Sequence, residues 1–406
     1  MQRMKRSIVL LACLLTLQSC SLQEHISKAT TRLEEQYNQL KTWEQLPQRT
    51  ISWSQAVAMM KKNNTEYLRI QQTIAKAERS EMSVYTDLIP GVSYYSYFNS
   101  ALSELTTSMN GNNISHQVNV NFYLPTLTQL PYRIYASKAS TFAAVKALEG
   151  KERELISKLY ANQRKQALAV RQKELESLTP EQKPDYLRTE TGAELAQWQE
   201  IASLLGDYSA RWQILPSSVP RFRWADYRDI TGSLDSLIVC QFALKLEQAR
   251  MQQYSIALRY LPTVNTSLYS PQLFSSMGGT YSGTFLDMDD TTLNLSLSYT
   301  LDTDLQNWNQ YQDSKETYEL QKRETHAEMM SLKQKLLSLK TSMDEYAAWR
   351  SFMHKRMEHL RTAPTANAEE YLENETTLHA MQKELLSQEA SAVESEAALI
   401  LQYGLR

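Results

Sequence analysis

The pattern of apolar and polar positions divides this chain into short alternating stretches and long helical ones. Four stretches alternate apolar and polar residues strictly in places, which is the pattern of a β-strand with one apolar face. In the clearest of them, Leu293, Leu295 and Leu297 alternate with Asn294 and Ser296. We expect strands at about 91–99, 117–125, 263–271 and 291–301. One apolar face and one uncharged polar face suit a membrane barrel, although a half-buried sheet in water would alternate in the same way.

The longer stretches carry apolar residues at the 3.5-residue spacing of a coiled coil. Between Leu305 and Leu360 there is no proline or glycine, and seam positions such as Leu332, Leu336 and Leu339 recur in steps of four and three. Proline interrupts the pattern further on, and we expect the chain to turn back there. The expected elements are a helix at about 233–260 and helical hairpins at about 130–205 and 303–402.

The same order of elements occurs twice along the chain. Pro90 and Pro262 each end a helical run just before a strand and lie 172 positions apart, whereas Leu124 and Leu301 lie 177 positions apart. The five-residue difference falls in the loop between the paired strands. An internal duplication sets the architecture, so we expect two repeats, each with a helix, a strand pair and a helical hairpin. The repeats and the N-terminal segment before them cover 51–210, 211–406 and 20–50.

Residues 1–19 have the composition of a secretory signal. A basic start precedes an apolar run over 7–17 that is too short to span a bilayer as a helix. The following Leu17-Gln18-Ser19-Cys20 resembles a bacterial lipobox, in which cleavage leaves Cys20 as a lipid-modified first residue with a stable membrane anchor. A plain secretory signal with a chance cysteine is the alternative. Cys240 is then the one remaining thiol, so we expect no disulfide within the chain.

Composition does not point to an enzyme. Removing three basic residues with the predicted signal leaves 40 basic and 45 acidic residues, a balance that does not favour nucleic acid as a partner. Ten glycines in 406 residues favour long helices over a globular α/β enzyme. The sequence has no phosphate-binding glycine loop, nucleophile elbow or His-Glu-x-x-His motif, and its six histidines are scattered. We therefore expect no catalytic residues, no metal site, and no cofactor other than the lipid on Cys20.

A sheet of four strands cannot stand alone in a membrane. It has two open edges, which hydrocarbon does not tolerate. A barrel therefore requires several chains. Three chains would supply twelve strands, and their helical hairpins would pack side by side as a tube.

Several short motifs recur in this duplicated order. The first repeat opens with Asn63-Asn64-Thr65-Glu66-Tyr67-Leu68-Arg69, the helical runs reach Pro90 and Pro262, and the repeats close on Leu-rich segments ending at Gly206 and Gly404. With these motifs the chain resembles the TolC-like outer membrane efflux family, from Ile51 to its end. The resemblance implies a mixed, mainly α fold in which a homotrimer forms a twelve-stranded barrel in the outer membrane and a periplasmic α-helical barrel.

The resemblance also implies a function and partners. Members of the family are passive conduits through which an inner membrane pump, joined by a periplasmic adaptor protein, exports its cargo. The adaptor docks at the hairpin tips, which here are Thr179 and Pro180 in the first repeat and Thr362, Ala363 and Pro364 in the second. These tips lack the glycine-containing turn that is usual in the family. The alternative function is a lipid-anchored periplasmic coiled-coil tether or adaptor without a pore.

The family's periplasmic aperture matches three carboxylates of this sequence. Glu370 and Glu373 fall on the segment that carries two aperture carboxylates, and Asp185 is the counterpart in the first repeat. Two carboxylates three positions apart lie on one helix face, so three chains would form two acidic rings that favour cations. The alternative is a solvated acidic turn at a helix start, which suits the helix dipole.

Overall fold

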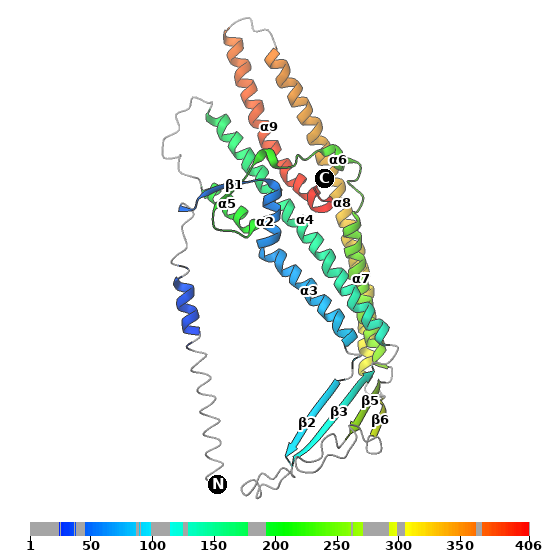
Figure 1. Cartoon of the computed structure of the whole chain (residues 1–406). Coiled ribbons are helices and arrows are strands. Elements are labelled where there is room, and N and C mark those ends of the chain that lie inside the picture. Colours follow the sequence, from blue (N-terminus) through cyan, green and yellow to red (C-terminus); the bar gives the residue numbers. More distant parts are fainter. Residues whose placement is uncertain are drawn as a thin grey trace.

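The structure, a computed structural model, has a mainly helical body that continues into a small β-sheet (Figure 1). It describes residues 24, 26–35, 37, 45–86, 89, 91–98, 114–124, 129–177, 192–260, 263–270, 292–298, 305–362 and 368–405. For the four strands of the sheet and for a few helix ends, the description covers the backbone alone.

Both repeats contain a helix, a strand pair and long helices in the predicted order. The elements of the first repeat are α2 (Trp53–Asn63), α3 (Thr65–Thr86), β2 (Gly91–Phe98), β3 (Ile114–Leu124), α4 (Gln129–Ser177) and α5 (Gly192–Leu205). Those of the second are α7 (Ser236–Ala257), η5 (Leu258–Tyr260), β5 (Thr263–Ser270), β6 (Thr292–Ser298), α8 (Gln306–Thr362) and α9 (Ala368–Tyr403). β3 begins three positions before the expected 117, and the last expected residues of the fourth strand, 299–301, lie outside the described residues. The division between the repeats at residue 210 stays a prediction.

The four strands form one antiparallel sheet in the order β2-β3-β5-β6. The central pair, β3 and β5, joins the two repeats, with Val118 opposite Ser270 and Leu124 opposite Val264. Among the described residues, β2 and β6 each pair along one side. The predicted apolar face of this sheet concerns side chains outside the description, and it stays a prediction.

Four helices lead into or out of the strands and pack in the same order as the strands do. α3 precedes β2, α4 follows β3, α7 precedes β5 and α8 follows β6 (Figure 1). α3 packs on α4, α4 on α7, and α7 on α8, so α3 and α8 are the edge helices of this array. Away from the sheet, α4 packs on α9 and α9 on α8. Over the described residues, α4 packs more extensively on α9 than on α5, its expected hairpin partner.

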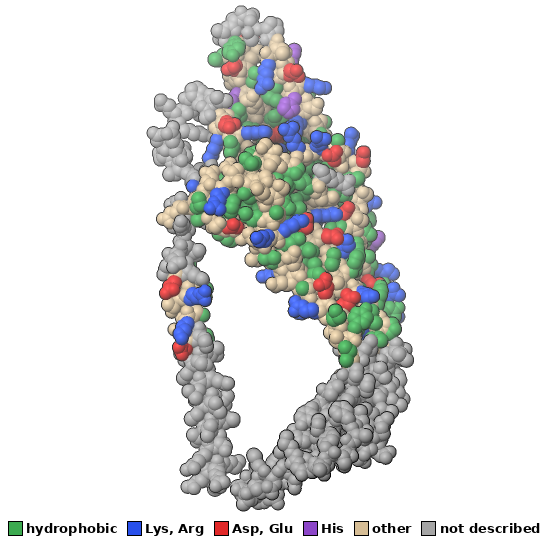
Figure 2. All heavy atoms as spheres, viewed as in Figure 1, with side chains coloured by type: hydrophobic (Ala, Val, Ile, Leu, Met, Phe, Trp, Pro, Cys, Tyr) green, Lys and Arg blue, Asp and Glu red, His purple; other side chains and the backbone are tan. Residues whose placement is uncertain are grey.

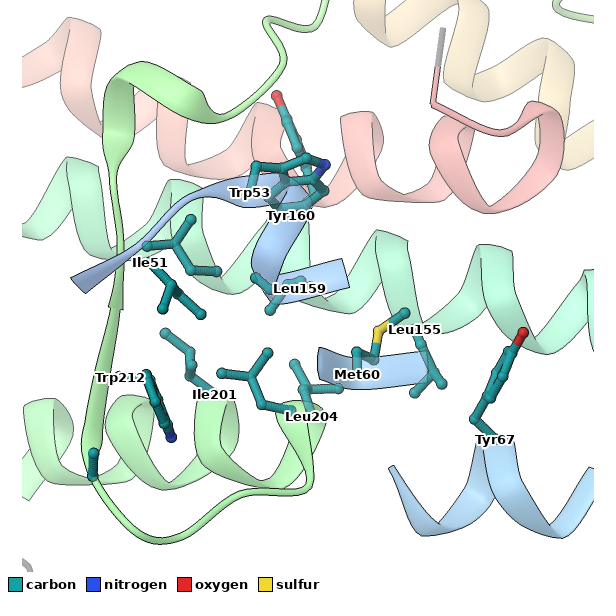
Figure 3. Packing of buried hydrophobic residues seen from close by; sticks show 14 of the residues in the cluster. Ile51, Trp53, Met60, Tyr67, Leu155, Leu159, Tyr160, Ile201, Leu204 and Trp212 are labelled. Carbon is teal, nitrogen blue, oxygen red and sulfur yellow. The ribbon is translucent and has the colours of Figure 1, made fainter. Parts of the chain in front are cut away.

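A layer that the sequence did not predict lies against the middle of α4. β1 (Gln48–Ile51) pairs in parallel with β4 (Arg211–Ile214), and η4 (Pro216–Ser218) and α6 (Trp224–Arg228) follow. Side chains from β1, α2, α4, α5 and β4 converge on one buried cluster (Figure 3). Strands of four residues are too short to show a clear alternation, which is why the apolar pattern did not reveal them. The capping box of Ser52 and Gln55, by contrast, is a local signal that fixes the start of α2.

Candidate functional site

The structure places only part of the predicted site. Cys20, Asp185, Thr179, Pro180, Ala363 and Pro364 lie outside the described residues. Thr362 ends α8 and is exposed, and its hydroxyl donates to the carbonyls of Glu358 and His359. Glu370 and Glu373 lie exposed in the first turns of α9. A helix start favours carboxylates for its own sake, so the aperture role of this pair stays a prediction.

The motifs that open and close the first repeat meet in space. Asn64, between α2 and α3, accepts hydrogen bonds at Oδ1 from the backbone N–H groups of Glu66 and Tyr67, each at 3.0 Å. Its Nδ2 donates to the carbonyls of Ser203 and Leu204 at the end of α5, at 3.3 and 3.0 Å. One buried side chain therefore caps α3 and ties it to α5.

Gly206 allows this close approach. Its φ is +67°, a conformation that favours glycine. A Cβ atom there would lie 2.4 Å from the carbonyl oxygen of Asn63. The sequence identified Asn64 and Gly206 as motif residues, but it did not show that they touch.

The second repeat makes the equivalent connection with charged groups. Asp235 caps α7 by accepting from the backbone N–H of Leu237, and it pairs with Arg153 of α4 at 2.7 Å. Arg153 also donates to the carbonyl of Gln402, near the end of α9, at 2.8 Å. Burial would raise the pKa of Asp235, but the hydrogen bonds from Arg153 and the N–H of Leu237 outweigh burial and lower it. The closing Gly404 has φ +79°.

Five charged side chains form an ion seam where α4, α8 and α9 meet: Arg164 and Arg171 on α4, Arg350 on α8, and Glu389 and Glu396 on α9. The two arginines of α4 and the two glutamates of α9 are each seven positions apart, so each pair keeps one face of a coiled helix. Glu389 lies 3.3 Å from Arg350 and 3.8 Å from Arg171, and Glu396 lies 3.8 Å from Arg164. Both carboxylates are buried.

Tyr160 completes the seam at the end nearest α6. Its hydroxyl donates to Glu396 at 2.8 Å, and both side chains are buried. Burial raises the pKa of Glu396, although the Tyr160 hydroxyl and Arg164 partly offset that rise. Burial, followed by the charge of Glu389, raises the pKa of Tyr346 to about 12.

A polar cavity of about 510 Å³ lies beside the ion seam, next to residues 216–222. Two buried atoms that line it, Gln163 Oε1 and Arg164 Nε, have no hydrogen-bond partner within the described part of the chain. Polar groups at seam positions fix how helices align, because a shift would leave charges unpaired. The seam therefore sets the alignment of α4 with α8 and α9. Sequence reasoning missed it, although the matching seven-residue spacing of the arginines and glutamates was a usable signal.

The two edge helices expose apolar side chains on faces turned away from their neighbours. Met82 of α3 is 65% exposed, and Trp308 and Met330 of α8 are 50% and 47% exposed. Met343, Met353 and Met357 of the same helix are buried, as the spacing predicts.

None of the helices in the described ranges is long and apolar enough to cross a membrane. Over the same residues, no cluster of three or more His, Cys, Asp or Glu side chains could hold a metal ion.

Comparison with known proteins identifies the fold. No family model matches this sequence, and no curated protein does. Solved structures do match. The open-state MtrE outer membrane channel of Neisseria gonorrhoeae has a TM-score of 0.55 at 15% identity, over 87% of this chain and 89% of that one. The outer membrane protein VceC of Vibrio cholerae has a TM-score of 0.57 at 13% identity, over 86% and 95%. The CmeC outer membrane channel of Campylobacter jejuni has a TM-score of 0.54 at 13% identity, over 86% and 85%. The chain has the fold of these proteins, so the predicted fold class is confirmed for the single chain. Its assembly into a trimeric barrel stays a prediction.

Proposed function

We propose that this chain is the outer membrane channel of a tripartite export system, a passive trimeric conduit from the periplasm to the exterior. The observation that carries the proposal is the common order of strands and helices. Four antiparallel strands continue four helices, and β2 with α3 forms one edge while β6 with α8 forms the other. In hydrocarbon every backbone N–H and C=O needs a partner, and copies of the same chain supply them at both edges.

The edge helices support the same assembly. Met82 lies nine positions before the start of β2, and Trp308 lies ten positions after the end of β6. These side chains therefore stand at a similar distance from the sheet. When β6 of one chain pairs with β2 of the next, α8 approaches α3, and the exposed apolar side chains of both helices become buried.

The remaining features of the proposal come from the sequence. Cys20 carries the lipid anchor, the hairpin tips dock a periplasmic adaptor that links an inner membrane pump, and Glu370 and Glu373 line the aperture with Asp185. We propose no catalytic activity. The alternative, a periplasmic tether without a pore, gives no role to a four-stranded sheet, and for this reason we favour the conduit.

The test is the oligomeric state and conductance of the full chain. Purified in detergent from outer membranes, the protein is expected to form trimers and to conduct in planar bilayers. Met82→Lys combined with Trp308→Lys should weaken the trimer, because two charges would be buried at each interface. Val239→Lys is the matched control, since Val239 is 43% exposed on α7, which is not an edge helix. A monomer without conductance would instead support the tether.

The aperture is tested separately. Glu370→Gln with Glu373→Gln should lower cation preference in the bilayer, because both rings lose their charge. Glu384→Gln, further along the exposed surface of α9, is the control. Unchanged selectivity and unchanged block by multivalent cations would remove the aperture assignment.

A further inference from the structure

A cavity of about 640 Å³ lies between α4 and α7, at the ends of these helices that face the sheet. We call it the junction cavity. Tyr132 and Tyr135 line it from α4. From α7 and the start of η5 it is lined by Glu247, Arg250, Met251, Tyr254, Ala257 and Leu258. α4 and α7 are the two inner helices of the four-helix array, so the cavity lies away from the proposed contacts between copies.

The junction cavity changes from polar to apolar toward the sheet. Glu247 and Arg250 lie at the end away from β5, with 3.8 Å between Oε2 and Nη1. Met251 and Ala257 follow along α7, and Leu258, the first residue of η5, stands five positions before the first residue of β5. The cavity therefore has a charged end toward the periplasm and an apolar end toward the proposed membrane.

Three tyrosines border this gradient. Tyr135 donates from its hydroxyl to Glu247 Oε1 at 3.3 Å, and Arg250 Nη2 donates to the Tyr254 hydroxyl at 3.2 Å, with its guanidinium 5.3 Å from the Tyr254 ring centre. Tyr132 bonds the carbonyl of Met251. Tyrosine is enriched at membrane–water interfaces because its ring is apolar and its hydroxyl polar. The three rings thus suit the level of the lipid headgroups.

At the charged end, Arg250 and Glu247 form only a weak ion pair. At 3.8 Å the pair is beyond hydrogen-bonding distance, and the Arg250 and Glu247 side chains are 50% and 30% exposed. A ligand that carries both a phosphate and an ammonium group matches this pair, since the guanidinium forms two parallel bonds to a phosphate and the carboxylate accepts from an ammonium. A ligand with a phosphate but no ammonium group would place its negative charge beside the carboxylate of Glu247.

The junction cavity opens on the outer side of the proposed tube. Tyr135 stands three heptads before Ile156 and four before Gln163, positions that keep one face of a coiled helix. Ile156 packs against the cluster formed with α2 and α5, and Gln163 donates to the carbonyl of Ile214 in β4. In a closed ring this extra layer lies outside, because three copies of it inside would obstruct passage. On the face that carries α2 and α3, hydrophobic side chains gather where the helices meet the sheet (Figure 2).

We propose that the junction cavity binds one phospholipid with a zwitterionic phosphoethanolamine headgroup. Arg250 holds the phosphate, Glu247 accepts from the ammonium, and the acyl chains run past Met251 and Leu258 toward the membrane. This inference rests on the proposed function, which places the base of the sheet at the membrane surface. The lipid would fill the groove between the repeats at the level where helix changes to strand.

Native mass spectrometry of the detergent-purified trimer tests the site. Phosphatidylethanolamine and phosphatidylglycerol with the same acyl chains are added in turn, and the bound fraction is titrated. The first lipid is expected to bind once per chain and more tightly. Arg250→Gln should weaken its binding about tenfold, the effect of losing one charge-assisted hydrogen bond. Glu247→Gln should remove the preference between the two lipids while leaving phosphate binding in place.

Lys245→Gln is the control, because Lys245 is a half-exposed cation on the same helix that pairs with Glu328 of α8. It should bind both lipids as the unaltered chain does. The inference would be overturned if Lys245→Gln and Arg250→Gln lost lipid binding equally. It would also be overturned if the unaltered chain showed no preference between the two lipids. Trimer mass and conductance are recorded for every variant. A conducting trimer without the preference refutes the lipid site alone, whereas loss of the trimer in the unaltered chain refutes the proposed function.

Discussion

Replacing Gly206 with alanine tests how tightly the first repeat closes. Gly206→Ala places a methyl group 2.4 Å from the carbonyl oxygen and 2.5 Å from the carbonyl carbon of Asn63. Both are backbone atoms and cannot rotate away. Gly404→Ala is the matched control, because Gly404 closes the second repeat with φ +79° and its added Cβ would lie 3.8 Å from Arg153 Nε, an ordinary contact.

The two substitutions share one cost and differ in another. Each places an L-residue in the left-handed region, which costs about 1–2 kcal/mol, while the stiffer unfolded chain returns roughly 0.4–1 kcal/mol. Gly404→Ala should therefore lower the free energy of unfolding by about 1 kcal/mol. Gly206→Ala adds the clash, at about 1–3 kcal/mol for overpacking, and moving Asn63 lengthens the bonds from Asn64 to the carbonyls of Ser203 and Leu204, worth about 1 kcal/mol each. The sum is about 4–6 kcal/mol.

Urea unfolding in detergent, followed by tryptophan fluorescence, measures the difference. Trp212 is a local probe, because its Nε1 donates to the carbonyl of Asp207, next to Gly206. Where unfolding is irreversible, thermal midpoints at one heating rate replace free energies. Gly206→Ala is expected to unfold well before Gly404→Ala. Equal midpoints for the two variants would refute the claim that close backbone contact, beyond backbone conformation, requires glycine at position 206.

Three further predictions concern buried and paired charges. Burial raises the pKa of Glu396 above 4.5, so the folded chain holds this proton more tightly than the unfolded chain. Stability should therefore fall as pH rises from 4.5 through the raised pKa. The thermal midpoints of Glu396→Gln should lack that fall. The lowered pKa of Asp235 has the opposite effect, because its contribution to stability is present above pH 3.8 and is lost as pH falls through the lowered pKa. In urea unfolding, Asp235→Asn should cost about 1–2 kcal/mol at neutral pH and little in acid. An equal loss at both pH values would contradict this. Tyr160→Phe leaves Glu396 buried without its hydroxyl donor and should cost about 1–3 kcal/mol of stability. In a double-mutant cycle with Glu396→Gln, the double variant should lose less stability than the two single losses added together. Strict additivity would show that the Tyr160–Glu396 hydrogen bond contributes no coupling energy.

The sequence predicted elements better than it predicted their partners. Alternation of apolar and polar residues, clearest in β3 and β6, located the four strands of the sheet, and proline marked where α3 and α7 end. Seam spacing located α8 and α9 but could not say what each helix faces, since leucine and methionine pack against any apolar stripe. The extensive packing of α4 on α9, across the repeats, was therefore not predicted. The pairing of β1 with β4 was missed because four residues carry too little pattern.

For the candidate site too, the sequence identified residues but not their contacts. Asn64 and Gly206 stood out as recurring motif residues, yet their contact depends on how α2 and α5 pack, which no local pattern encodes. The ion seam joins α4 to α8 and α9, which follow much later in the sequence. Arg350 is separated from Arg171 by most of the second repeat, and only the fold brings both beside Glu389. The aperture carboxylates remain a prediction because they depend on neighbouring chains.

The parallel pairing of β1 with β4 fixes the end of the N-terminal segment, residues 20–47, that connects the proposed lipid anchor to the folded chain. With lipid on Cys20 as proposed, Gln48 lies 28 positions after the anchor. Twelve of these positions, 24, 26–35 and 37, are helical, and the segment can reach at most roughly 70 Å at about 1.5 Å per helical and 3.4 Å per other residue. Between β1 and β2, the helices α2 and α3 account for about 50 Å at 1.5 Å per residue. On this estimate, the proposed lipid anchor can hold a subunit at the bilayer before the trimer assembles.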